Sequence, residues 1–193
     1  MATDHDMRIG AGDGVRGRAL SAASHLLMEY GADEMSLRGI AERAGIGLAS
    51  IYHHFSSKED LLLHLALKGF SELRRDLEIS RTAQADVGPM RRAARAYLTF
   101  ADKRAPLFAL MFDPRLLSRH ETLREAERSA YAVYEAAVQD DTRIDADHRA
   151  QTATAIWTLG RGISASNASY PGGRMPDDMQ ERLAQGIAWL LDR

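Results

Sequence analysis

The sequence predicts an all-α fold in which a small N-terminal helical unit is joined to a larger helical body. Two observations lead to this prediction. Apolar residues recur at the spacing of an amphipathic helix along nearly the whole chain, and long alternating patterns that would predict strands do not occur. Glycine, proline and helix-capping residues also divide the 193 residues into segments of helical length.

The first two helices are predicted from their ends as well as from their apolar faces. A helix from Val15 stops before Gly31, because glycine commonly takes the left-handed position after a helix. Ser36 is a favourable N-cap for a second helix, which ends at Gly45. Together these signals predict a compact helical unit near the N-terminus.

A short third helix is predicted over about residues 48–55, and a longer fourth helix begins after Ser57. Ser57 can cap the fourth helix, and the acidic residues that follow it suit the positive end of the helix dipole. Its apolar stripe continues to about residue 80. The residues before the first helix, 1–13, are polar and rich in glycine and aspartate, so we expect a flexible tail there.

The rest of the chain is predicted to form the helical body. A polar segment at 81–88 separates it from the fourth helix, and prolines mark several later helix starts. The further helices are expected at about residues 89–103, 106–112, 119–139, 145–169 and 179–191. The predicted organisation is therefore a tail (1–13), an N-terminal domain (14–60) and a C-terminal domain (61–193).

Composition excludes several classes of function. The chain has no cysteine, so disulfides, zinc–thiolate sites and thiol nucleophiles are excluded. No segment resembles a signal peptide, and the longest apolar runs are too short to cross a bilayer. We therefore expect a cytoplasmic protein that does not bind a membrane.

The sequence offers no enzyme signature. It lacks a nucleophile–base pair at informative spacing, a glycine-rich phosphate loop and a Glu-x-x-His pair, so we expect neither catalysis nor a cofactor. Adjacent His53 and His54 diverge by about 100° on a helix and cannot readily bind one ion together. Asp60 and His64 supply only two ligands, so no metal site is predicted.

Residues 36–60 have the pattern of a helix-turn-helix, in which a second short helix is held across the first by a tight turn. Ala41 is small enough for close approach of the two helices, and Gly45 can adopt the positive φ that the turn requires. Ile51 and Phe55 are one helical turn apart and are predicted to face inward. A glycine turn between two helices is also found in plain helical hairpins, and this alternative stays open from the turn alone.

The opposite side of the predicted third helix carries the candidate DNA contacts. Ala49 and His53 point away from Ile51 and Phe55, and small, hydroxyl and imidazole groups there can meet bases and phosphates. Backbone amides and a lysine at the start of the fourth helix can bind a phosphate. The predicted DNA-binding residues are Ser36, Arg38, Gly47, Leu48, Ala49, Ser50, Tyr52, His53 and Lys58.

The charge of the N-terminal region argues mildly against nucleic-acid binding. Residues 1–60 contain six arginine or lysine side chains against nine aspartate or glutamate side chains. Binding would then depend on hydroxyls, amides and a few placed cations, with few phosphates neutralised per half-site. A helical interaction module without DNA binding therefore remains an alternative.

The motif at residues 36–62 resembles the TetR family of bacterial transcription regulators. The matching segments are SLRGIA at 36–41, Gly45-Ile46, IYHHF at 51–55 and KEDLL at 58–62. The resemblance implies that Tyr52 and Lys58 contact phosphates and that residues 47–53 contact operator bases. Two departures are the apolar Leu48 and Ala49, which could contact thymine methyl groups.

The C-terminal region resembles the WHG-type sensor domain of the same family. The segments AYLTFADKRAPLFALMF and AIWTLGRGI carry this resemblance, with Arg161 where the family usually has histidine. An apolar pocket with a few polar groups that bind a small-molecule effector is one interpretation. Plain core packing is the other. The candidate ligand-binding residues are Tyr97, Phe100, Phe108, Met111, Phe112, Trp157 and Arg161.

Two copies of a helix-turn-helix are needed to select a long operator, and the last two helices are predicted to pair them. Residues 150–168 are rich in alanine, glycine and serine, which permits close helix packing. The family resemblance implies a four-helix bundle across a two-fold axis. The predicted function is a homodimeric repressor that a small-molecule ligand releases from double-stranded operator DNA; a ligand-insensitive or activating regulator of the same fold is the alternative.

Overall fold

The computed structural model describes residues 4–82, 87–170 and 174–191, and within these ranges the chain is helical with no strand. This confirms the predicted all-α fold. The helices are α1 (Asp4–Tyr30), α2 (Leu37–Ala44), α3 (Leu48–His54), α4 (Lys58–Thr82), α5 (Pro89–Lys103), α6 (Ala105–Met111), α7 (Pro114–Arg119), α8 (Glu121–Gln139), the 3₁₀ turn η1 (Ala146–His148), α9 (Arg149–Ala168) and α10 (Asp177–Leu191).

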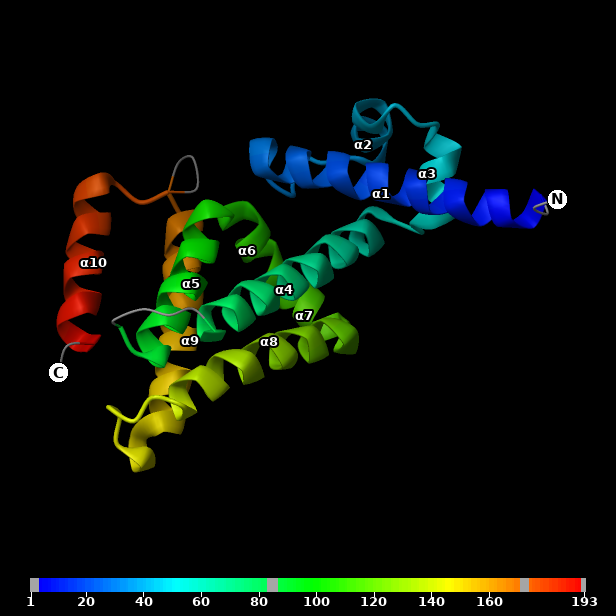
Figure 1. Cartoon of the computed structure of the whole chain (residues 1–193). Coiled ribbons are helices and arrows are strands. Elements are labelled where there is room, and N and C mark those ends of the chain that lie inside the picture. The colour runs from blue at the N-terminus through cyan, green and yellow to red at the C-terminus, as the bar shows by residue number, and fades with distance from the viewer. Residues whose placement is uncertain (1–3, 83–86, 171–173, 192–193) are drawn as a thin grey trace.

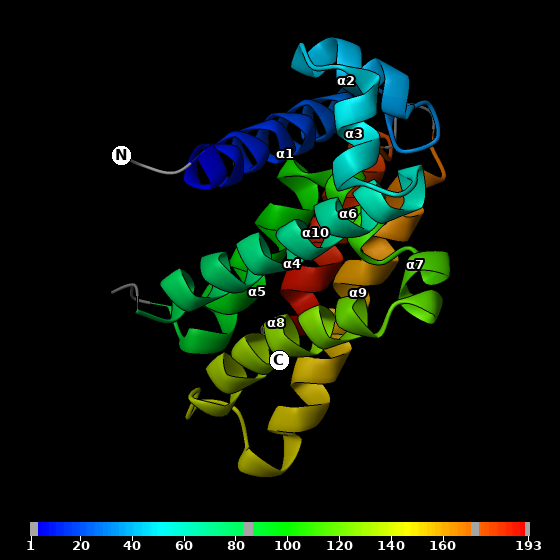
Figure 2. The same cartoon turned by 90° about the vertical axis from the view of Figure 1, so that its right-hand side faces the viewer.

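The elements form two parts joined by α4. Helices α1, α2 and α3 lie together at one end, and α4 runs from α3 into the body formed by α5 to α10 (Figures 1 and 2). In the body α4 packs against α5, α6 and α8. The buried apolar side chains form one continuous cluster from α1 to α9, so the predicted domains share a core.

The N-terminal end of α1 differs from the sequence prediction. The sequence predicted a flexible tail over residues 1–13 and a helix from Val15, whereas α1 already begins at Asp4. Extending an existing helix by one residue costs far less than nucleating a new one, so α1 can continue through a glycine-rich stretch. Residues 1–3 lie outside the described ranges.

The turn between α2 and α3 has the predicted geometry. Gly45 lies in the left-handed region with φ 62° and ψ 39°. The Ile46 N–H donates to the Ala41 carbonyl at 3.1 Å and the Gly45 N–H donates to the Glu42 carbonyl at 3.2 Å. This paired arrangement is the Schellman motif, which satisfies carbonyls at the end of α2 and fixes the direction in which the chain leaves it.

Helix α7 was not predicted. Asp113 is its N-cap, and one carboxylate oxygen accepts hydrogen bonds from the N–H groups of Arg115 and Leu116 at 2.7 and 3.1 Å. Pro114 occupies the first helical position, which suits a residue without an N–H. The sequence therefore held a local start signal for α7 in Asp113 and Pro114.

Asp141 follows α8 and links the end of that helix to the start of α5. Its carboxylate is almost fully buried and accepts hydrogen bonds from the Met90 N–H at the start of α5, and from the side chain and N–H of Arg143. Burial of the carboxyl opposes ionisation, but the hydrogen bonds from Arg143 and Met90 outweigh it and lower the pKa of Asp141. The charged carboxylate thus supplies the acceptor that the N-terminus of α5 lacks.

The free energy of unfolding of the Asp141→Asn protein is expected to be about 2 kcal/mol lower than that of the wild type at neutral pH, because a charged acceptor of buried donors is lost. A lowered pKa in the folded state means that the carboxylate stabilises the fold above its unfolded pKa of about 3.9 and stops doing so as pH falls through the folded value. Urea unfolding of both proteins between neutral pH and about pH 3 checks this. The difference between them should shrink on acidification, and a constant difference would contradict the assignment.

Candidate functional site

Helix α3 has one buried side and one exposed side, as predicted. Ile51 and Phe55 are both 0% exposed. Tyr52 is 57% exposed and Leu48 is 39% exposed, and Ala49 and His53 are also exposed. The outer surface of α3 therefore presents a phenol, an imidazole and small apolar groups within two helical turns.

The start of α3 is open. Gly47 is its N-cap, and no side chain forms a capping hydrogen bond there. The Gly47 carbonyl accepts the first helical bonds, from the N–H groups of Ser50 at 2.9 Å and Ile51 at 3.3 Å. Ser50 is half-buried on the flank of the helix. No side chain therefore occupies the free N–H groups of the first turn of α3 through a capping hydrogen bond.

Phe55 fixes the end of α3 against its neighbours. Its ring meets the His64 ring of α4 edge-to-face, with 5.5 Å between centroids. The Arg16 guanidinium of α1 lies 5.7 Å from the Phe55 centroid. Because this one ring contacts both α1 and α4, the direction of α3 is coupled to the long helix that enters the body.

Two predicted contacts lie at the start of α2. Ser36 caps α2, since its hydroxyl oxygen accepts a hydrogen bond from the Gly39 N–H at 3.1 Å. Its own O–H remains a possible donor to a phosphate. Arg38 is highly exposed and forms an ion pair with Glu42 at 3.5 Å, which is a weak surface interaction that a phosphate can replace.

Lys58 is the first residue of α4 and follows closely after the end of α3. Its ammonium group donates to the Asp33 carbonyl at 3.0 Å, so one of its three N–H bonds ties the loop after α1 to the start of α4. The other two donors can still bind a phosphate. The structure thus gives Lys58 a positioning contact that the sequence did not predict.

Another cation of this region is engaged within the protein. The Arg43 guanidinium donates to the Glu29 carboxylate of α1, with one contact at 3.2 Å. Hydrogen bonding from Arg43 lowers the pKa of Glu29. Arg43 is therefore a poor candidate for a phosphate contact, which agrees with the small number of contacts expected from the charge.

His53 and His54 are adjacent in α3 but are not placed to bind one ion together. The His53 and His54 rings meet edge-to-face at 5.2 Å, a geometry in which they do not share one ion. The part of the chain that the structure describes contains no group of three or more histidine, aspartate or glutamate side chains able to hold a metal.

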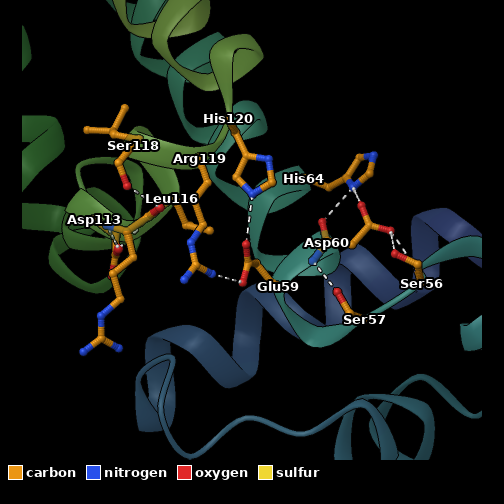
Figure 3. A network of polar contacts seen from close by, with 12 residues as sticks. Ser56, Ser57, Glu59, Asp60, His64, Asp113, Leu116, Ser118, Arg119 and His120 are labelled. Atoms are coloured by element: carbon orange, nitrogen blue, oxygen red, sulfur yellow. Dashed lines mark hydrogen bonds and ion pairs between the residues drawn. The ribbon is translucent and has the colours of Figure 1, made fainter.

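The start of α4 is held by a local network of polar contacts (Figure 3). The Ser57 hydroxyl caps α4 by accepting from the Asp60 N–H at 3.1 Å, as predicted. The Asp60 carboxylate accepts from the N–H and hydroxyl of Ser56, at 2.8 and 3.0 Å, and lies 3.2 Å from the His64 ring. These contacts make a rigid junction between α3 and α4.

Glu59 extends this junction to the C-terminal body. Its carboxylate is 3.1 Å from Arg119 Nη1, at the end of α7, and 3.2 Å from His120 Nε2, just before α8 (Figure 3). Sequence reasoning missed all three residues as partners. No local pattern could pair them, because the contact joins segments about sixty residues apart in the chain.

The predicted ligand-binding residues come together as a packed aromatic core. Tyr97, Phe108 and Met111 are 0% exposed, and Phe100 and Trp157 are almost fully buried. The Tyr97 ring stacks on the Trp157 ring with 4.6 Å between centroids, and Phe112 packs edge-to-face on Phe70.

The polar groups of this cluster already have protein partners. The Tyr97 hydroxyl donates to the Trp157 carbonyl at 2.9 Å, and burial raises the pKa of Tyr97, so the hydroxyl keeps its proton. Arg161 lies 4.8 Å from the Phe112 centroid and donates to Glu127 at 3.2 Å. Glu127 is therefore an acidic partner of Arg161 within the protein.

An apolar cavity of about 510 Å³ lies elsewhere in the body, between α5, α9 and α10. None of the predicted ligand-binding residues lines it. Its apolar walls include Leu98, Ile163, Leu183 and Ile187. Its polar lining residues are Arg91, Arg95, Thr99, Asp102, Ser164, Asn167 and Gln180. Its volume falls within the range typical of small-molecule sites, about 300–1,000 Å³.

Helix α3 is held across α2 by a tight turn, is buried on one side and exposed on the other, and is followed directly by the capped helix α4. This arrangement is that of a helix-turn-helix DNA-binding protein. The chain belongs to the TetR family. Residues 19–65 match the family described as bacterial regulatory proteins of the tetR family, and residues 90–190 match the tetracyclin repressor-like C-terminal domain. This is a family of bacterial transcription regulators, which are not enzymes.

Characterised relatives and solved structures agree with this family. The repressor KstR2 of Mycobacterium tuberculosis is 44% identical over 55 residues, covering 28% of this chain and 27% of the repressor. The activator FasR of Mycolicibacterium smegmatis is 26% identical over 140 residues, covering 70% of this chain and 64% of the activator. Both matches span less than two thirds of the relative's length.

Two solved structures share the fold. A protein of unknown function from Rhodococcus sp. RHA1 superposes with a TM-score of 0.66 at 25% identity, covering 82% of this chain and 88% of that one. A transcriptional regulator from Aquifex aeolicus superposes with a TM-score of 0.63 at 15% identity, covering 91% and 99%. Within the described ranges, no helix combines the length and apolar character that crossing a bilayer requires.

Proposed function

We propose that the protein is a homodimeric repressor that binds a two-fold symmetric operator in the cytoplasm and is released by a small-molecule ligand. The exposed outer side of α3 supports the operator contact more directly than any other observation. Tyr52 and His53 lie on that side with Leu48 and Ala49, and all four are exposed. In this proposal α3 enters the major groove, and Ser36, Arg38 and Lys58 contact flanking phosphates.

Gel-shift and anisotropy titrations with the DNA flanking the protein's own gene test operator binding. Tyr52→Phe and Lys58→Ala are expected to weaken all sites alike, and Lys58→Ala should reduce the salt dependence of log K by about one unit per half-site. Ser50→Ala and His53→Ala should instead change sequence preference. Unchanged binding in all four variants would reject the assignment and favour an interaction module that does not bind DNA.

Repression is proposed over activation because KstR2, which is 44% identical to this chain over 55 residues, is named a repressor. The named activator FasR covers more of the chain at lower identity, which keeps activation as the second candidate. A reporter driven by the bound promoter distinguishes the two. Deletion of the gene should raise transcription for a repressor and lower it for an activator.

Dimerisation is proposed through α9 and α10. The exposed side of α9 is built from small residues, among them Ala155, Gly162 and Ala165, which allow close packing of another helix. On α10, Met179 is 41% exposed and Trp189 is 56% exposed. Pairing of these surfaces would place two α3 helices on successive major grooves, about 34–36 Å apart.

The Gly162→Leu variant is expected to be monomeric and to lose most of its operator affinity. A Cβ at Gly162 meets nothing within 4 Å, so the protomer itself accommodates the side chain. Gly17→Leu is the matched control, since a Cβ there also meets nothing within 4 Å and Gly17 lies on α1. Sedimentation equilibrium reports the association state. A Gly162→Leu protein that stays dimeric would exclude this side of α9 from the interface.

Ligand release is proposed to act through α4. Glu59 in the first turn of α4 contacts Arg119 and His120, and the rest of α4 packs in the body. A ligand that favours one arrangement of the body would shift α4 and change the spacing of the two α3 helices. A ligand with equal affinity for both arrangements would have no effect.

A further inference from the structure

The described residues contain two buried side-chain oxygens without a hydrogen-bond partner, Tyr134 Oη and Ser164 Oγ. Tyr134 is surrounded by the aromatic core and lines no described cavity. Ser164 is 7% exposed and lines the cavity between α5, α9 and α10. A buried hydroxyl left unpaired is costly, so its position at an apolar cavity points to a missing partner.

The cavity also has a basic end. Arg95 lines it from the first half of α5, together with Arg91. Helices α5 and α9 run in the same direction and α10 runs in the opposite direction (Figure 1). The rest of the lining includes apolar side chains such as Leu98, Leu183 and Ile187, together with Thr99 and Asp102 of α5.

The positions of the two polar residues follow from the contact between α5 and α9. The backbone of Gly160 on α9 lies against the Tyr97 ring of α5. Arg95 comes two residues before Tyr97 on α5, and Ser164 comes one turn after Gly160 on α9. Because the two helices run in the same direction (Figure 1), Arg95 and Ser164 lie on opposite sides of this contact.

We propose that this cavity binds the effector, and that the effector is an apolar molecule with an anionic group at one end and a hydrogen-bonding oxygen at the other. The anionic group pairs with Arg95, and the oxygen pairs with Ser164. This inference rests on the proposed function, because only a ligand-responsive regulator needs such a site. It differs from the sequence prediction, which placed the ligand among the aromatic residues now found packed in the core.

Three probes of equal chain length test the site by isothermal titration calorimetry of the full chain: decanoate, 10-hydroxydecanoate and decan-1-ol, each below its micellar concentration. The wild type should bind 10-hydroxydecanoate about three- to tenfold more tightly than decanoate, although the added hydroxyl makes the probe more polar. Decan-1-ol, which lacks the carboxylate, should bind most weakly.

Two variants test which residue binds each end of the probe. Ser164→Ala should bind both acids equally, because the hydroxyl that distinguishes them is gone. Arg95→Gln should weaken both acids by a similar factor and leave decan-1-ol unchanged. Ser71→Ala, at an exposed serine of α4 outside the cavity, is the control and should change none of the affinities.

Several results would overturn the assignment. They are the absence of binding, equal affinity of the wild type for both acids, or a preference that survives in Ser164→Ala. Dissociation of the dimer as the acids bind, seen by sedimentation, would show that a second copy occupies the cavity, which also overturns it. Binding with the expected pattern that leaves the operator complex intact would support the site and count against ligand release.

Discussion

Replacement of Phe55 by alanine is expected to abolish operator binding and to lower the free energy of unfolding by about 3–5 kcal/mol. The Phe55 side chain is 0% exposed and its ring contacts His64 of α4 and Arg16 of α1. Its removal leaves a cavity behind α3 at the point where three helices meet. Urea unfolding followed by circular dichroism measures the stability, and fluorescence anisotropy with labelled operator measures the binding.

Tyr52→Ala is the matched control, because it removes an exposed aromatic ring from α3. Tyr52 is 57% exposed, so its loss should change stability by no more than about 0.5 kcal/mol. Operator binding should nevertheless be lost. The pair thus separates a residue that supports α3 from one that contacts DNA. Wild-type operator affinity in Phe55→Ala would show that the position of α3 does not depend on this packing.

The N-terminal unit was predictable because its signals are local. Ser36 and Ser57 cap helices through bonds to N–H groups three residues away, and Gly45 takes the positive φ that its turn requires. The two sides of α3 follow from a spacing of one helical turn. The sequence therefore predicted which side chains of α3 are buried and which are exposed without information about distant parts of the chain.

The sensor region was predicted less well because its features depend on contacts between distant segments. The resemblance to a sensor domain placed Tyr97 and Trp157 in one candidate site, but it could not distinguish a pocket from a core. In the structure these aromatic rings pack against one another, and the cavity lies instead between α5, α9 and α10. Ser164 gave no signal in the sequence, since one serine in a helix of small residues becomes informative only when its burial is known.

Gly160→Ala is expected to lower the free energy of unfolding by about 1–3 kcal/mol, although alanine normally stabilises a helix relative to glycine. A Cβ at Gly160 would lie 2.1 Å from Tyr97 Cε1 and 2.8 Å from Tyr97 Cζ. The Tyr97 ring has no room to retreat, because it stacks on Trp157 and its hydroxyl bonds to the Trp157 carbonyl. The melting temperature should fall by roughly 2–4 °C per kcal/mol in a protein of this size.

Gly17→Ala provides the control with the opposite sign. A Cβ at Gly17 meets nothing within 4 Å, so this change in α1 should raise stability by up to about 1 kcal/mol. Combining Gly160→Ala with Tyr97→Leu should cost less than the sum of the two single changes, because the smaller side chain relieves the contact. If Gly160→Ala instead stabilised the protein as Gly17→Ala does, α9 would not lie against Tyr97. The placement of Ser164 and Arg95 on opposite sides of this contact, on which the proposed effector depends, would then be wrong as well.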